Sequence, residues 1–236
     1  QDLKNLNIPI HKRSNRDKLI TKFSSIYITD NNYWNYFDEK YQKKHFIIKG
    51  YFEDNNIFTK HINKIRKWFP IQKKTNINDL VLHFRGGDRL FYKNEFAYKP
   101  SPESFISAIN KFEFKKLYIV TDMPFWNYIT AKELEKQIFH VKVKKKMSIP
   151  IQSSVDYFNS IVNALEKFDP ILYKKNISDE FNFIRSFDKI LFQHSTTAWW
   201  AARLSNASKV GVSRGWRNWK LNNKTNLLEN ENWFQW

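Results

Sequence analysis

Short apolar runs alternate along this chain with segments whose apolar residues recur every three or four positions. The first pattern is typical of buried strands and the second of amphipathic helices. Strands are expected at 79–84, 117–120, 139–143, 189–192 and 209–212. Helices are expected at 102–109, 124–137 and 155–165, around 184–187, and from 195 to 204. Strands that alternate with helices in this way predict an α/β fold, a Rossmann-like parallel sheet with helices on both faces.

The first part of the chain has a weaker pattern. Strands are expected at 23–28 and from His45 to Gly50, and an amphipathic helix from Ile57 to Phe69 that ends at Pro70. We therefore expect an N-terminal segment, 1–75, and a Rossmann-like domain, 76–236. The strand at 209–212 is expected to be the last of the sheet. The tail beyond it is expected to pack back over the domain through its four tryptophans, Trp216, Trp219, Trp233 and Trp236.

Composition narrows the class of protein. With 42% hydrophobic and 17% aromatic residues in 236, the chain is able to bury a core and is not a disordered polymer. The absence of cysteine excludes disulfides, thiolate catalysis and cysteine zinc sites. No apolar run approaches the roughly 18 to 20 residues that span a bilayer. Because the chain opens on Gln1 and not on Met, we expect a leader or an upstream domain before it.

The net charge of +17 would attract polyanions. Lys, Asn, Ile, Phe and Tyr are abundant together, which is what an A/T-rich genome would encode, so we discount part of this basicity and expect no nucleic-acid partner. The densest basic run, 142–146, is interpreted as an exposed strand end. The expected location is cytoplasmic, with a Golgi-type lumen as the alternative.

The first stretch that indicates chemistry is His83-Phe84-Arg85-Gly86-Gly87-Asp88, at the end of an apolar strand. A loop at that end of a parallel sheet is where open α/β folds bind ligands. Arg85 is suited to phosphate, because its guanidinium can donate two hydrogen bonds at once. The alternative is an ordinary Gly-Gly turn with a surface pair between Arg85 and Asp88.

The second stretch is His194-Ser195-Thr196-Thr197, at the start of a helix. Three hydroxyls beside the free N–H groups of a first helical turn are suited to phosphate. The alternative is a simple helix cap, for which one hydroxyl is enough. If both stretches line one edge of the sheet, they hold a diphosphate between them, and no metal is needed to neutralise a departing nucleotide.

The order of these motifs resembles the fucosyltransferase superfamily, most closely the bacterial-type α-1,2-fucosyltransferases. Their His-x-Arg-Arg-Gly-Asp motif is similar to His83–Asp88, and their Ser-Thr-Phe-Ser-Trp-Trp block is similar to Ser195–Trp200. Their Gly-Tyr-aromatic segment and the helix after it resemble Gly50–Phe52 and the helix through Trp68. The resemblance covers roughly residues 45–220.

The resemblance implies the donor-binding half of a GT-B glycosyltransferase. The reaction would be an inverting, metal-independent transfer from GDP-fucose to a hydroxyl of a glycan acceptor, with residues 1–75 on the acceptor side. The resemblance also places Arg85 at the diphosphate of the donor and His83 at its guanine base. Glu180, where the family has Asp, would hold the guanine or the ribose. The other implied donor-site residues are Gly87, Ser195, Thr196 and Thr197, and Asp88 or Glu95 would act on the acceptor.

Two departures keep alternatives open. Gly86 stands where the family has a second arginine, which points to a different nucleotide sugar as one alternative. The family's Gly-x-Gly-Asn-Gln segment has no counterpart in this chain, which has only five glycines. This second departure favours another alternative, a non-catalytic module that binds glycans or other polyanions through its basic surface.

Overall fold

The computed structural model describes residues 25–29, 45–49, 55–92, 99–138, 149–193, 195–213 and 232–236. The chain forms two compact units. The first comprises Gln1–Phe69 and Lys220–Glu229, and the second comprises Pro70–Trp219 and Asn230–Trp236. The sequence did not indicate that a C-terminal segment belongs to the first unit, and the predicted functional division after residue 75 stays a prediction.

In the first unit, β1 (Ser25–Thr29) and β2 (His45–Lys49) pair in parallel, with Ser25 opposite His45. Helix α2 (Asn55–Trp68) follows, as its apolar spacing predicts. The Phe69 N–H still bonds to the Ile65 carbonyl at 2.9 Å. The helix ends there because the residue before a proline is disfavoured in helical conformation, and Pro70 comes next.

The second unit is built on a six-stranded sheet in which every pair is parallel. Its strands are β3 (Asn76–Phe84), β4 (Leu117–Thr121), β5 (Ile171–Leu172), β6 (Phe187–Phe192), β7 (Lys209–Val212) and β8 (Trp233–Gln235). Their spatial order is β5-β4-β3-β6-β7-β8. The chain thus starts in the middle, moves outward to β5, and returns to the other side of β3. This is the Rossmann order, so the predicted fold class is confirmed.

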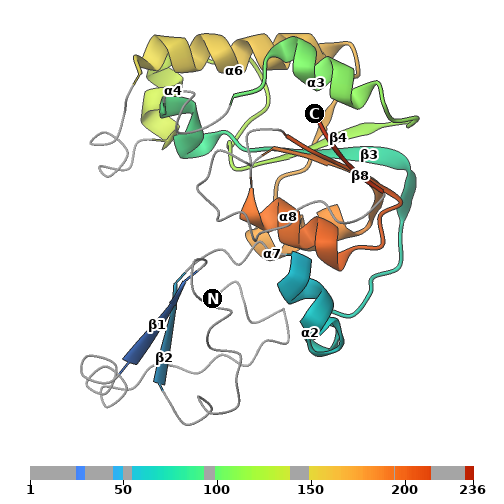
Figure 1. Cartoon of the computed structure of the whole chain (residues 1–236). Coiled ribbons are helices and arrows are strands. Elements are labelled where there is room, and N and C mark those ends of the chain that lie inside the picture. The colour runs from blue at the N-terminus through green and yellow to red at the C-terminus, as the bar shows by residue number, and fades with distance from the viewer. Residues whose placement is uncertain are drawn as a thin grey trace. The chain divides into compact units, whose positions relative to one another are not determined.

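Helices cover both faces of this sheet (Figure 1). On one face lie α3 (Pro102–Ile109), α4 (Ala131–Ile138) and α6 (Ile151–Glu166). On the other lie α7 (Ile177–Arg185) and α8 (Thr196–Leu204). A short 3-10 helix, η4 (Gly87–Phe91), follows β3 after Arg85 and Gly86. No helix in the described ranges is both long enough and apolar enough to cross a bilayer.

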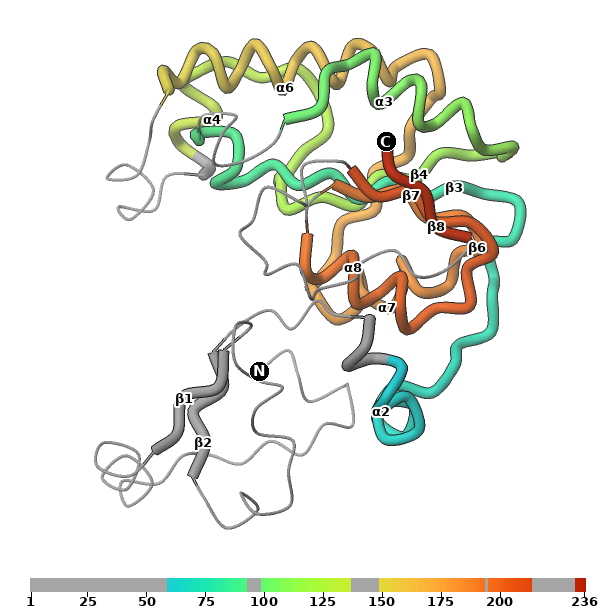
Figure 2. Tube along the Cα trace, viewed as in Figure 1, coloured from blue at the N-terminus to red at the C-terminus, as the bar shows by residue number. Residues whose placement is uncertain are grey.

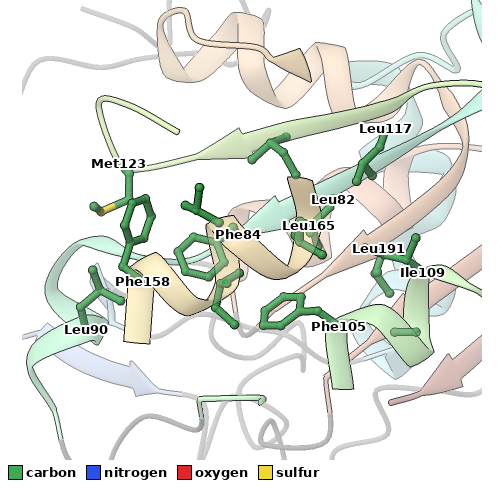
Figure 3. Close-up of a cluster of buried hydrophobic side chains, with 14 of the residues drawn as sticks. Leu82, Phe84, Leu90, Phe105, Ile109, Leu117, Met123, Phe158, Leu165 and Leu191 are labelled. Atoms are coloured by element: carbon green, nitrogen blue, oxygen red, sulfur yellow. The ribbon is translucent and has the colours of Figure 1, made fainter. Parts of the chain in front are cut away.

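The main core lies between the sheet and the α3, α4 and α6 layer (Figure 3). Leu82 and Phe84 of β3 point into it, and the Phe84 ring meets Trp126 and Phe158 edge-on at 5.2 and 5.9 Å. Because successive side chains of a strand point to opposite faces, Val81 and His83 lie on the face that α7 and α8 cover. The alternating direction of successive side chains along β3 therefore places His83 on the α7 and α8 side.

The expectation that 209–212 is the last strand is wrong, because β8 pairs beyond it (Figure 2). The Val210 N–H donates to the Asn232 carbonyl at 2.9 Å, and the Trp236 N–H donates to the Val212 carbonyl at 3.0 Å. Both Trp233 and Trp236 are buried, as expected for packing, whereas Trp216 and Trp219 lie outside the described residues. Three residues are too few to show a strand pattern, so only the pairing reveals β8.

Three predicted helices have different bounds. The helix expected at 155–165 is α6, which is longer at both ends. The helix expected at 124–137 begins only at Ala131, because Thr130 and Glu133 cap each other: Thr130 N–H donates to Glu133 Oε2 at 2.8 Å and Glu133 N–H to Thr130 Oγ1 at 3.3 Å. The helix expected around 184–187 is α7, which ends at Arg185, and Phe187 opens β6 instead. The strand expected at 139–143 and the basic run at 142–146 lie outside the described residues.

Candidate functional site

The two stretches that the sequence singles out meet at the carboxyl edge of the sheet. β3 and β6 are neighbours, with His83 opposite Phe192. After β3 the chain turns towards the α3 layer, whereas after β6 it turns into α8 on the other face (Figure 1). Open parallel sheets bind ligands at the point where the connections of neighbouring strands leave towards opposite faces. The structure therefore brings the 83–88 loop beside the start of α8.

Gln193 joins the two strand ends. Its backbone N–H donates to the His83 carbonyl at 3.1 Å, and its side-chain Oε1 accepts the backbone N–H of Arg85 at 3.0 Å. The residue is 3% exposed. These bonds extend the pairing of β3 and β6 by one step into the loops. Gln193 is a site residue that sequence reasoning missed, because a single glutamine after a strand carries no recognisable pattern.

The Arg85 guanidinium is shared by two carboxylates. Its Nη2 donates to Asp88 Oδ1 at 3.0 Å, and its Nη1 forms an ion pair with Asp122, which follows β4. Asp122 also accepts the Gly86 N–H through Oδ1 at 2.8 Å. The pair with Asp88 that the sequence offered as an alternative is thus present. With both carboxylates ionised, one positive and two negative charges give this group a net charge of −1.

The two glycines of the loop lie against the end of β4. Gly87 has φ +45°, and a Cβ on it would lie 2.4 Å from Asp122 Oδ2. A Cβ on Gly86 would lie 2.5 Å from Met123 Cγ. Neither site has room for a side chain, and Gly87 also has a backbone conformation that favours glycine.

Asp122 is the second site residue that sequence reasoning missed. Burial raises the pKa of its carboxyl, while the charge of Arg85 and the hydrogen bond from Gly86 offset part of that rise. A signal was present, because Asp122 directly follows the buried strand β4, and polar residues at that end of a parallel strand are site candidates. What the sequence did not show was that β4 is the neighbour of β3.

His83 is almost fully buried, at 7% exposure. Its Nδ1 has no hydrogen-bond partner among the described residues. Burial lowers the pKa of His83 to about 3, and the positive charges of Arg85 and Lys174 act in the same direction. His83 is therefore a neutral imidazole at neutral pH.

Glu180 lies in the first turn of α7 and is connected to the same edge through Lys174. The Lys174 ammonium pairs with Glu180 Oε1 at 3.2 Å and donates to the Thr121 carbonyl at 2.7 Å. The Lys175 N–H also donates to Glu180 Oε1, at 3.2 Å. The structure thus brings Glu180 into one connected group with Arg85, through Lys174, Thr121 and Asp122.

Helix α8 begins at Thr196 with Ser195 as its cap. The Ser195 Oγ accepts the Ala198 N–H at 3.3 Å, which satisfies one of the free donors of the first turn. Thr196 and Thr197 are half-buried in that turn. The cap anticipated from the sequence is present, and the first-turn N–H groups place partial positive charge at this end of the helix.

Replacing the cap should cost measurable stability. We expect Ser195→Ala to lower the free energy of unfolding by about 1 kcal/mol, because the Ala198 N–H loses its acceptor in a buried setting. Urea denaturation of the purified chain measures the difference. Asn176→Ala, which removes the equivalent cap of α7, is the matched control and should cost a similar amount. A Ser195→Ala variant as stable as the wild type would contradict this assignment.

Two sequence-predicted residues, Glu95 and His194, lie outside the described residues. Within the described ranges, no group of three or more His, Asp or Glu side chains is arranged to hold a metal ion. Comparison with known proteins gives no relative for this chain, since no family model, curated protein or solved structure matches it.

Proposed function

We propose that this chain is a glycosyltransferase that binds a nucleotide diphosphate sugar, with GDP-fucose as the first donor to test. The observation that carries the proposal is the meeting of the Arg85 loop and the α8 start where β3 and β6 diverge. In Rossmann-like sheets this is the place for a nucleotide, with its phosphates near a helix N-terminus. The motif order that resembles fucosyltransferases supports the same reading.

The proposed reaction is a single displacement. The oxygen of a glycan hydroxyl attacks the anomeric carbon of the donor sugar, the bond from that carbon to the diphosphate oxygen breaks, and GDP leaves with the electron pair. The hydroxyl proton passes to a carboxylate, for which Asp88 and Glu95 are the candidates. The Arg85 guanidinium and the N-terminal end of α8 would stabilise the negative charge that develops on the leaving diphosphate.

The test is ligand binding by the full chain. In a thermal-shift screen against GDP, UDP and their sugars, we expect GDP compounds to raise the melting temperature most, because a ligand stabilises the state that binds it. Isothermal titration should then show GDP affinity reduced at least about tenfold in Arg85→Ala. Arg85→Lys should be intermediate, since an ammonium keeps the charge and loses the two-point geometry.

Lys132→Ala is the matched control, because it removes one positive charge from an exposed position on α4. It should bind GDP as the wild type does. Equal GDP binding by Arg85→Ala and the wild type would contradict the role of Arg85. Preference for UDP compounds would replace the proposed donor by another nucleotide sugar.

The net charge of +17 favours a second candidate, a non-catalytic module that binds an anionic polymer. Such binding weakens steeply with salt because counterions are released from the polymer. Heparin and a neutral glycan, titrated at low and moderate salt, separate the two candidates. Salt-sensitive heparin binding that neither GDP nor Arg85→Ala affects would favour the module.

A further inference from the structure

The amide of Gln193 has a fixed orientation. Its Oε1 accepts the Arg85 N–H at 3.0 Å, so the oxygen faces the β3 loop and the nitrogen must be the other end of the amide. Nε2 donates to no described residue. Several buried polar atoms without a partner among the described residues are fully enclosed by protein, and this nitrogen is not among them. Gln193 is thus only 3% exposed, yet its amide nitrogen at the edge of the sheet has no partner in the described part of the chain and is not fully enclosed.

The cation of the motif next to this amide is already paired within the part of the chain that the structure describes. Arg85, the nearest motif cation, is paired with both Asp88 and Asp122. This pairing weakens the attraction of Arg85 for an anionic ligand, so hydrogen-bond donors that carry no net charge contribute more to binding at this edge. Two neutral sources lie close in the chain: the Nε2 of Gln193 and, two positions beyond it, the capped first turn of α8. Donors that are held in place before the ligand arrives cost no reorganisation when it binds.

We propose that Gln193 is a ligand-binding residue, whose Nε2 donates a hydrogen bond to a phosphate oxygen of the donor diphosphate beside the first turn of α8. This inference rests on the proposed function and specifies its phosphate subsite. Gln193 then has two roles, one for each end of its side-chain amide. Oε1 holds the Arg85 loop against β6, and Nε2 binds the ligand.

The isosteric variant Gln193→Glu separates these roles. A carboxylate oxygen still accepts the Arg85 N–H, and the N–H donors are replaced by a second oxygen that repels phosphate. In isothermal titration near neutral pH with the full chain, we expect GDP to bind at least about tenfold more weakly. The melting temperature without ligand should fall, because the new carboxylate is placed in a buried position, so GDP binding is compared at a temperature at which both proteins are folded.

Asn163→Asp is the matched control for charge. It makes the same change from amide to carboxylate on the exposed side of α6, where the side-chain oxygen accepts the Tyr128 hydroxyl. It should bind GDP like the wild type. Gln193→Met, which removes both ends of the amide, should lose GDP affinity and also melt at a lower temperature.

Two results would overturn the proposal: GDP affinity unchanged in Gln193→Glu, or an equal loss in Asn163→Asp. Inorganic pyrophosphate as a second probe separates this inference from the proposed function. If the wild type binds pyrophosphate but not GDP, and Gln193→Glu loses pyrophosphate, the phosphate subsite is supported and the proposed donor fails. If the wild type binds neither probe, both proposals fail.

Discussion

Acidification from about pH 7 to about pH 4 should lower the free energy of unfolding by about 3 kcal/mol through His83. The cause is the burial of a neutral imidazole beside Arg85 and Lys174, which lowers the pKa of His83 to about 3. In the unfolded chain the same group titrates near its ordinary value of 6.5. Between these two values the unfolded state binds a proton that the folded state does not.

Because only the unfolded state binds this proton, acidification favours unfolding. Stability from His83 is fully present above pH 6.5 and is lost as the pH falls towards about 3. Asp122 acts in the opposite direction, because its pKa is raised in the folded state. Comparison of the wild type with His83→Gln in urea denaturation over this pH range isolates the histidine. The variant should lose less stability on acidification, and parallel pH profiles would contradict the assignment.

Gly87→Ala should destabilise the second unit by about 2 to 4 kcal/mol and abolish GDP binding. Two causes add. A left-handed conformation at φ +45° is unfavourable for alanine, and the new Cβ would meet Asp122 Oδ2 at 2.4 Å. To relieve that contact the carboxylate must move, and its bonds to Arg85 and Gly86 would then break. Urea denaturation and GDP titration measure the two effects.

A double-mutant cycle separates the two causes. In an Asp122→Ala background the carboxylate is absent, so Gly87→Ala should cost only the backbone part, about 1 kcal/mol. The coupling between positions 87 and 122 should therefore be large. A cost of Gly87→Ala that is the same in both backgrounds would show that the contact with Asp122 contributes nothing.

The charge balance at the Arg85 loop has a consequence for ligand binding. An arginine that binds phosphate alone presents a full positive charge, whereas this one is already paired with Asp88 and Asp122. These two carboxylates hold the guanidinium in place and reduce its attraction for a dianion. The neutral donors of Gln193 and of the α8 first turn therefore contribute more to ligand binding than they would beside a second arginine. Position 86 has no room for an arginine, because Gly86 packs closely against Met123.

Local signals in the sequence predicted most of the elements of the second unit. Apolar runs marked β3, β4, β6 and β7, and the caps at Ser101 and Ser195 marked helix starts. These signals are readable because burial of a whole strand, or of one helix face, dictates the residue types within a few positions. The two-residue β5 and the three-residue β8 were missed, since so few residues carry no period.

The residues of the candidate site were predicted only in part, because some of them are defined by contacts between distant parts of the chain. Arg85, Asp88 and Ser195 stand in recognisable local motifs, but Asp122 and Gln193 acquire their roles from neighbours far along the chain. Asp122 contacts Arg85 across 37 positions, and Gln193 contacts it across 108. No local pattern can encode such contacts.

The sequence by itself determined that this chain alternates strands and helices and that a Gly-Gly loop and a hydroxyl-rich helix start follow two of the strands. Those features depend on interactions between residues close in the chain. Only the tertiary structure decided that these two strands are neighbours, that β8 completes the sheet, and that Arg85 is paired with two carboxylates. Strand order and ion pairing depend on which distant segments pack together, and that is settled by the fold as a whole.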